Sequence, residues 1–111
     1  MSDIAALRRQ LKIKSGVTMR LKKENGMYQK EVVDQKLKKV KLVADGAEEW
    51  DIKNAGKMEE ESEKMIKDSA TRLDKAYGEL RDLVVRDRTY LLRAFREDFL
   101  KAEGILEEAS L

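Results

Sequence analysis

The stretch Ile66–Val84, IKDSATRLDKAYGELRDLV, carries the clearest periodic pattern in the chain. Its apolar residues step by four, three, four, three and four: Ile66, Ala70, Leu73, Tyr77, Leu80 and Val84. That alternation is the heptad pattern of a helix that packs lengthwise against other helices. It therefore predicts a long helix in an all-α protein.

Upstream, the same stripe continues through Ile52, Ala55, Glu59 and Ser62. Between Ser62 and Ala70 it takes two successive steps of four, by way of Ile66. Two such steps form a stutter, which moves an apolar stripe around a helix. The pattern predicts one helix over about 49–86, with a bend near residues 65–68. The acidic residues at 49–51 suit its N-terminus.

The segment before it predicts a helix over about 3–44, because Asp45-Gly46 is a natural helix stop. Its stripe is amphipathic but interrupted by Glu24 and Gln35. We assign these apolar positions to it: Leu7, Leu11, Val17, Leu21, Tyr28, Val32, Val40 and Val43.

The last segment shows a further heptad and predicts a helix over about 89–109, after a turn near 86–89. Its apolar positions are Leu92, Phe95, Phe99, Ala102, Leu106 and Ala109. Two long helices and one shorter helix predict an elongated antiparallel three-helix bundle, coiled-coil-like, in a single domain spanning 1–111.

Composition excludes several kinds of chemistry. The 111 residues include 24 Lys or Arg and 22 Asp or Glu, but no Pro, Cys or His. Disulfides, thiol nucleophiles, Ser-His-Asp triads and the usual zinc sites are thereby excluded. The dense acidic run Glu59–Glu63 is interpreted as a solvated face, since a carboxylate metal site needs ligands from several helices. We expect no enzyme activity, no cofactor and no metal.

Charge is unevenly distributed along the chain. Residues 1–45 hold 12 basic and 5 acidic residues (+7), and residues 46–111 hold 12 basic and 17 acidic ones (−5). The basic first helix is compatible with nucleic-acid or anionic-membrane binding, with attraction to an acidic protein, or with a solvated face. Tyr28 is its only aromatic residue, which disfavours single-strand binding. No apolar run approaches the roughly 20 residues of a membrane span, so we expect a cytosolic protein.

Several short segments of the sequence resemble the tubulin-folding cofactor A (tubulin-specific chaperone A) family. On the first helix they are Leu11–Val17 (LKIKSGV), Arg20-Leu21, Lys23-Glu24, Met27-Tyr28 and Lys30-Glu31. On the second they are Trp50–Lys53, Glu61-Ser62, Met65–Asp68, Arg72-Leu73, Ala76-Tyr77 and Leu80. The resemblance covers 11–31 and 50–80 and fades beyond Val84. Lys67 stands where the family usually has Pro, which predicts a continuous but bent second helix.

This resemblance implies a non-enzymatic chaperone that captures and stabilises quasi-native β-tubulin on the route to the α/β-tubulin heterodimer. It implies β-tubulin and other tubulin-folding cofactors as partners, neither nucleic acid nor membrane, and a cytoplasmic, cytoskeleton-associated location. The alternatives are a generic coiled-coil interaction module and a basic nucleic-acid-binding helical domain. Monomer and homodimer both stay open, because leftover apolar positions such as Val33, Met58 and Leu100 can pair two chains.

The resemblance also places a partner-binding surface on both long helices. Its residues are Lys12, Lys14, Arg20, Lys23 and Lys30 on the first helix, and Glu61, Ser62, Met65 and Asp68 on the second. A structural role is the alternative for each. Glu61 can pair with a lysine across the bundle, and Met65 can belong to the core.

Overall fold

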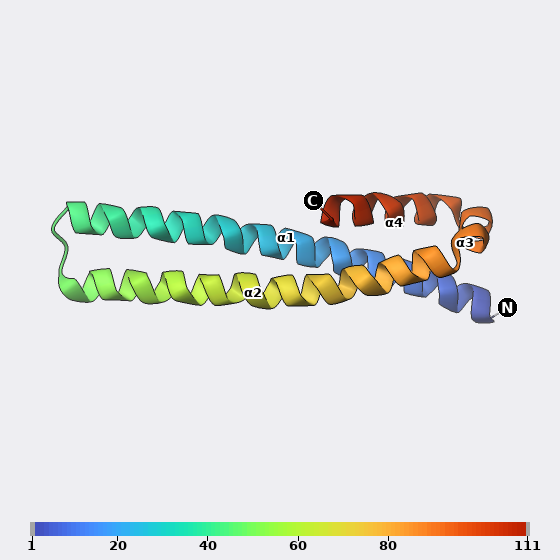
Figure 1. The fold of residues 1–111 in the computed structure, drawn as a ribbon, viewed down its shortest axis with the longest axis horizontal. Coiled ribbons are helices and arrows are strands. Elements are labelled where there is room, and N and C mark those ends of the chain that lie inside the picture. The colour runs from blue at the N-terminus through green and yellow to red at the C-terminus, as the bar shows by residue number, and fades with distance from the viewer. Residues whose placement is uncertain (1, 111) are drawn as a thin grey trace. The chain divides into compact units, whose positions relative to one another are not determined.

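The computed structural model describes residues 2–110, with side chains from Asp3 to Ser110. Within this range it contains four helices and no strand: α1 (Ser2–Ala44), α2 (Glu49–Arg86), α3 (Arg88–Ala94) and α4 (Arg96–Ala109) (Figure 1). The prediction of an all-α protein is confirmed. No described helix is long and apolar enough to cross a membrane.

The helices contribute to two compact units. Unit 1 combines α1 up to Lys22 with the chain from Thr71 onward, and unit 2 is Lys23–Ala70. Both long helices thus continue from one unit into the other. The expectation of a single domain over 1–111 stays a prediction, and Met1 and Leu111 lie outside the described residues.

The turn between α1 and α2 forms at the predicted Asp45-Gly46 stop. Gly46 has a φ of 70°, a left-handed conformation that favours glycine. The Gly46 amide donates to the Val43 carbonyl at 3.2 Å, and the Ala47 amide donates to the Leu42 carbonyl at 3.0 Å. These bonds satisfy carbonyls that the helix end leaves open, so the sequence ends α1 by a glycine cap.

The buried face of α2 differs from the predicted stripe. One line of buried and half-buried residues steps by three and four without interruption: Ile52, Ala55, Glu59, Ser62, Ile66, Ser69, Leu73, Ala76, Leu80 and Leu83. The predicted positions Ala70 and Tyr77 are half-buried and Val84 is buried, so they lie beside this seam. The seam itself passes through Ser69 and Ala76 and shows no stutter. The helix is continuous through Lys67, as predicted. The bend near 65–68 stays a prediction.

The seam of α1 is equally regular and more polar than predicted. Along it lie the buried or half-buried residues Leu7, Leu11, Lys14, Thr18, Leu21, Asn25, Tyr28, Val32, Gln35, Lys39 and Leu42, and Ser15, Val17 and Glu24 beside them are also buried or half-buried. Gln35 continues this seam rather than interrupting it. Val40 and Val43 were assigned to the stripe, but both are exposed. The prediction is wrong at these two positions because the heptad continues through Lys39 and Leu42 instead.

Asn25 anchors the polar part of the seam in unit 2. Its Nδ2 donates to the Ser69 hydroxyl at 2.9 Å and to the Ile66 carbonyl at 3.1 Å. Its Oδ1 accepts from Gln29 Nε2 at 2.6 Å. Hydrogen bonds offset the cost of burying the Asn25 amide, and such a pair favours one alignment of the turns of the two helices.

The third predicted helix is two helices, which corrects the three-helix prediction. α3 ends at Ala94 and α4 begins at Arg96, with Phe95 at φ −138° and ψ 55° between them. Leu91 and Phe99 are both buried, yet eight residues of a straight helix separate two side chains by about 80° around its axis. The break at Phe95 lets both enter one core. Neither Gly nor Pro marks it in the sequence.

The core of unit 1 joins α1, α2, α3 and α4. Its buried residues are Leu11, Leu80, Leu83, Val84, Leu91, Phe99, Ala102 and Ile105. The ion pair from Arg8 Nε to Asp98 Oδ2, at 2.9 Å, fixes the start of α4 beside the start of α1. In Figure 1, α4 runs parallel to this part of α1 and antiparallel to the end of α2.

Two glycine-to-alanine substitutions should have opposite effects on stability, one inside a helix and one in the turn. A Cβ added at Gly78 in α2 meets no atom within 4 Å, so Gly78→Ala should raise the free energy of unfolding by about 0.5–1 kcal/mol. Gly46→Ala should lower it by about 1 kcal/mol because of its positive φ. Urea denaturation measures both. If Gly78→Ala destabilises the protein, the space around that position is not open in solution.

Candidate partner-binding surfaces

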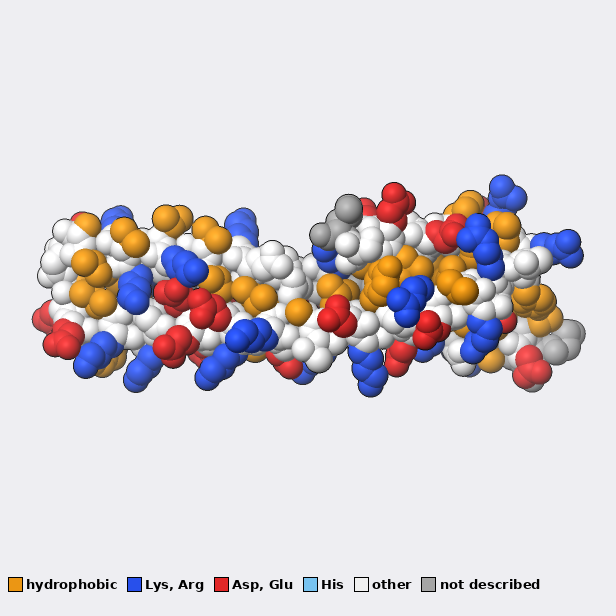
Figure 2. All heavy atoms as spheres, in the orientation of Figure 1, with side chains coloured by type: hydrophobic (Ala, Val, Ile, Leu, Met, Phe, Trp, Pro, Cys, Tyr) orange, Lys and Arg blue, Asp and Glu red, His pale blue; other side chains and the backbone are white. Residues whose placement is uncertain are grey.

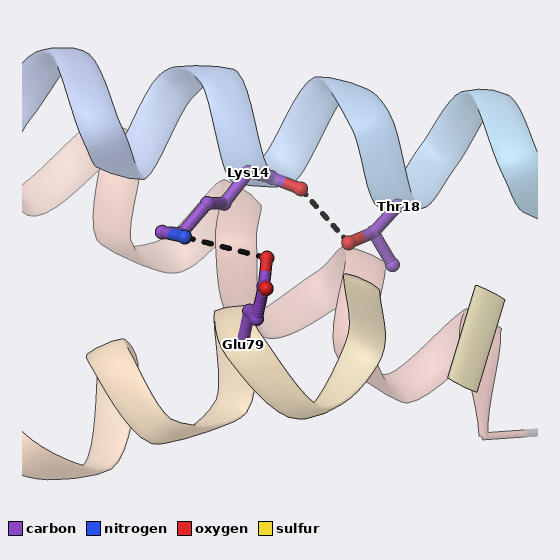
Figure 3. Close-up of polar contacts among 3 residues, drawn as sticks. All are labelled: Lys14, Thr18 and Glu79. Atoms are coloured by element: carbon purple, nitrogen blue, oxygen red, sulfur yellow. Dashed lines mark hydrogen bonds and ion pairs between the residues drawn. The ribbon is translucent and has the colours of Figure 1, made fainter. Parts of the chain in front are cut away.

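Lys12, Lys14 and Arg20 of the predicted surface lie in unit 1. Lys12 and Arg20 are exposed, whereas Lys14 is half-buried. The Lys14 Nζ contacts Glu79 Oε2 of α2 at 3.5 Å, and the Thr18 hydroxyl donates to the Lys14 carbonyl at 2.8 Å (Figure 3). Lys14 therefore has a structural role between two helices. Arg20 also interacts within the chain, so Lys12 presents its charge to solvent most directly.

Lys12 also borders a hollow between α1 and α4. The hollow measures about 310 Å³ and is lined by Lys12, Ser15, Gly16, Met19, Asp98, Lys101 and Ile105. Within the described residues the buried Ser15 hydroxyl has no hydrogen-bond partner. The sequence indicates only the α1 residues of this hollow, because the resemblance that identifies Lys12 fades before α4. Lys101 is a neighbouring cation that the sequence did not single out.

The other six predicted residues lie in unit 2. Lys23, Lys30 and Asp68 are exposed, and Asp68 interacts within the chain. The remaining three gather at one hollow of about 280 Å³, lined by Glu31, Gln35, Met58, Glu61, Ser62 and Met65.

In that hollow Ser62 is buried and belongs to the α2 seam, whereas Glu61 and Met65 are exposed. The Gln35 Oε1 is buried without a hydrogen-bond partner among the described residues. Met58 adds a second exposed thioether beside Met65. Flexible methionines beside carboxylates make an adaptable surface for a protein, since thioethers repack against varied apolar shapes.

These surfaces offer polar, charged and apolar side chains for contact with another molecule. Among the described residues, no three acidic side chains converge to hold a metal ion. Three of the acidic cluster, Glu60, Glu61 and Glu63, are exposed. The hollow in unit 1 is lined by two lysines, a carboxylate and a methionine, and the hollow in unit 2 by two carboxylates and two methionines, among other residues.

An apolar row on α1 was missed as a unit. Val33, Leu37 and Val40 are 56, 64 and 66% exposed. The sequence indicates only Val33 as an apolar residue left outside the seam, because its pattern places Val40 in the seam. A seam traced through Gln35, Lys39 and Leu42 would have separated this second row from the first.

Comparisons with known proteins agree over nearly the whole chain. Residues 6–106 match the model of the family described as Tubulin binding cofactor A. The chain is 38% identical over 103 residues to tubulin-specific chaperone A from Gallus gallus and from Homo sapiens, covering 93% of each sequence.

Two solved structures are similar in fold. The human tubulin chaperone cofactor A is 37% identical with a TM-score of 0.79, over 95% of this chain and 99% of that one. Tubulin folding cofactor A from Arabidopsis thaliana is 26% identical with a TM-score of 0.79, over 96% and 97%. The described residues thus carry the family's helices as well as its sequence, and the chain belongs to the tubulin binding cofactor A family.

Proposed function

We propose that this protein is a non-enzymatic chaperone in the cytoplasm that captures quasi-native β-tubulin and stabilises it on the route to the α/β-tubulin heterodimer. The observation that carries the proposal is the family match over 6–106, together with relatives named tubulin-specific chaperone A. Exposed lysines on α1, and the hollow holding Glu61 and Met65, are consistent with a protein partner. Other tubulin-folding cofactors are proposed to take β-tubulin onward.

Capture from a folding reaction tests this function directly. Labelled β-tubulin is released from the cytosolic chaperonin in the presence of the chain, and complexes are separated by native electrophoresis. We expect a stable complex with β-tubulin and none with an unrelated substrate of the same chaperonin. Equal capture of both substrates would instead indicate a generic coiled-coil interaction module. Capture of neither would refute the proposal.

Charge reversal tests the basic face of α1. The variant Lys12→Glu/Lys23→Glu/Lys30→Glu changes exposed side chains and keeps the Lys14–Glu79 ion pair. We expect its association rate with β-tubulin to fall about ten-fold at low salt, because electrostatic steering is lost. The rate should also become less sensitive to salt, while helicity stays unchanged. Stopped-flow fluorescence measures the rate, and circular dichroism the helicity.

A matched control distinguishes the effect of this face from the effect of the protein's net charge. Lys57, Lys64 and Lys75 are exposed lysines of α2, and their reversal to Glu changes the net charge equally. This control should retain most of the association rate. If both variants slow association equally, the effect belongs to total charge. If neither does, the basic face of α1 is not part of the interface.

A further inference from the structure

The exposed row Val33, Leu37 and Val40, called here the α1 stripe, faces away from the helix pairing of unit 2. At 100° per residue these three side chains fall within an arc of about 60°, centred about 140° from the α1 seam. In Figure 2 apolar side chains line this outer edge of the C-terminal half of α1. Isolated exposed apolar residues are ordinary, but a contiguous row at heptad spacing is typical of an interaction face.

Lysines border the α1 stripe on both edges. Lys36 lies about 40° beyond Val40 on one side, and Lys41 lies about 40° beyond Leu37 on the other. Both lysines are exposed. Residues 30–41 contain five lysines and two acidic residues, a net charge of +3. The stripe is therefore an apolar row with a lysine on each side and a net positive charge around it, although the exposed Asp34 lies about 60° beyond Leu37 on the side of Lys41.

A groove extends the stripe toward α2. It measures about 450 Å³ and is lined by Lys36, Lys39, Val40, Val43 and Glu59. Val43 is 56% exposed and enlarges the apolar surface at this end. Aliphatic side chains of a partner can fill such a groove while its carboxylates meet the lysine edges.

We propose that the α1 stripe is the docking site for an amphipathic helix whose apolar face is flanked by acidic residues. The proposal rests on the proposed function, in which β-tubulin presents that helix. Charge complementarity selects this occupant, because carboxylates on both flanks meet Lys36 and Lys41 while the apolar row is covered. A second copy of the chain is a poorer fit. It would bring the +3 segment against itself, and like charges across an interface are repulsive.

Polar substitution in the stripe tests its contact with β-tubulin. Leu37→Gln/Val40→Gln changes two exposed side chains, so the fold should be retained. We expect β-tubulin released from chaperonin to bind about ten-fold more weakly, because contacts at the centre of an interface dominate its affinity. Met27→Gln is the matched control. Met27 is 69% exposed in the same helix and unit, on another face, and the substitution should leave capture unchanged.

The outcomes separate this site from the proposed function. If wild-type chain captures β-tubulin and Leu37→Gln/Val40→Gln captures it equally well, the stripe proposal is overturned while the function stands. If Met27→Gln weakens capture as much, the loss is not specific to the stripe and the proposal is again overturned. If wild-type chain captures nothing, the proposed function fails, and the peptide experiment below decides the stripe.

A designed peptide probes the chemistry without tubulin. The probe is a three-heptad amphipathic helix with Leu at a and d and Glu at e and g, compared with the same peptide bearing Lys at e and g. We expect the Glu peptide to bind at least ten-fold more tightly, in a salt-sensitive manner. Methyl NMR of the full chain should show the shifts at Val33, Leu37 and Val40. Equal affinities, no binding, or shifts confined to other residues would overturn the proposal.

Sedimentation velocity tests the competing occupant. The wild-type chain and Leu37→Gln/Val40→Gln should have the same oligomeric state, because the stripe is open to a partner. A wild-type dimer that this variant converts to a monomer would show that a second copy covers the stripe. That result would overturn the proposal.

Discussion

Phe99→Ala is expected to lower the free energy of unfolding by about 3–5 kcal/mol, a large share of the roughly 5–15 kcal/mol that stabilises a small protein. Phe99 is 1% exposed and belongs to the unit 1 core with Leu11, Leu80 and Leu91. The Arg88 guanidinium lies 5.6 Å from its ring centroid. Removing the ring leaves a cavity where α3 and α4 meet α1 and α2, so α4 should lose its anchor first.

Urea denaturation followed by circular dichroism gives the overall loss for Phe99→Ala, and hydrogen exchange locates it. Protection should fall most in α4 and less in unit 2. Leu100→Ala is the matched control: it is the next residue of the same helix, is 49% exposed, and should cost less than about 1 kcal/mol. Similar losses for both variants would mean that Phe99 is not the anchor of this core.

The extents of the long helices could be predicted because their ends carry local chemistry. Asp45-Gly46 ends α1 through a positive φ that glycine adopts without strain. The acidic residues Glu49 and Asp51 begin α2 where the helix dipole favours them. Such signals act over one turn and are visible in sequence alone.

The phase of the seam could not be predicted from apolar residues, because several of its members are polar. Thr18 and Asn25 in α1, and Ser62 and Ser69 in α2, are all buried. Thr18, Asn25 and Ser69 make hydrogen bonds within their own helix or to groups distant in sequence, as between Asn25 and Ser69. Apolar residues alone therefore indicate Ala70 rather than its buried neighbour Ser69, and the spacing through Ala70 contains a stutter that the spacing through Ser69 does not.

The break between α3 and α4 and the exposure of the α1 stripe both depend on tertiary packing. Phe95 ends α3 so that Leu91 and Phe99 share one core, which is a tertiary requirement without a local marker. Val40 is equally apolar whether it faces the seam or solvent. Its exposure follows from the position of the seam, which only the packed helices reveal.

Of the predicted surface, Glu61, Ser62 and Met65 do gather at one hollow.

Asn25→Ala is expected to lower the free energy of unfolding by about 2 kcal/mol, since it removes a buried amide that Ser69, the Ile66 carbonyl and Gln29 all contact. The double variant Asn25→Leu/Ser69→Ala should behave differently. The buried amide and the buried hydroxyl are then both replaced by apolar groups, and the Gln29 amide is exposed and can bond to water instead, so the stability should equal or exceed that of wild type.

The double variant should no longer hold α1 and α2 in one unique register. A leucine can pack against several turns of α2, whereas the amide of Asn25 finds its acceptors only opposite Ile66 and Ser69. We therefore expect Asn25→Leu/Ser69→Ala to unfold at a urea concentration at least as high as wild type, but to give broadened NMR lines and mixed species in sedimentation velocity. A double variant as uniform as wild type would show that the register is set elsewhere along the seam. A double variant less stable than Asn25→Ala would show that the site requires a polar pair for packing as well, because leucine then fails to fill the space of the amide.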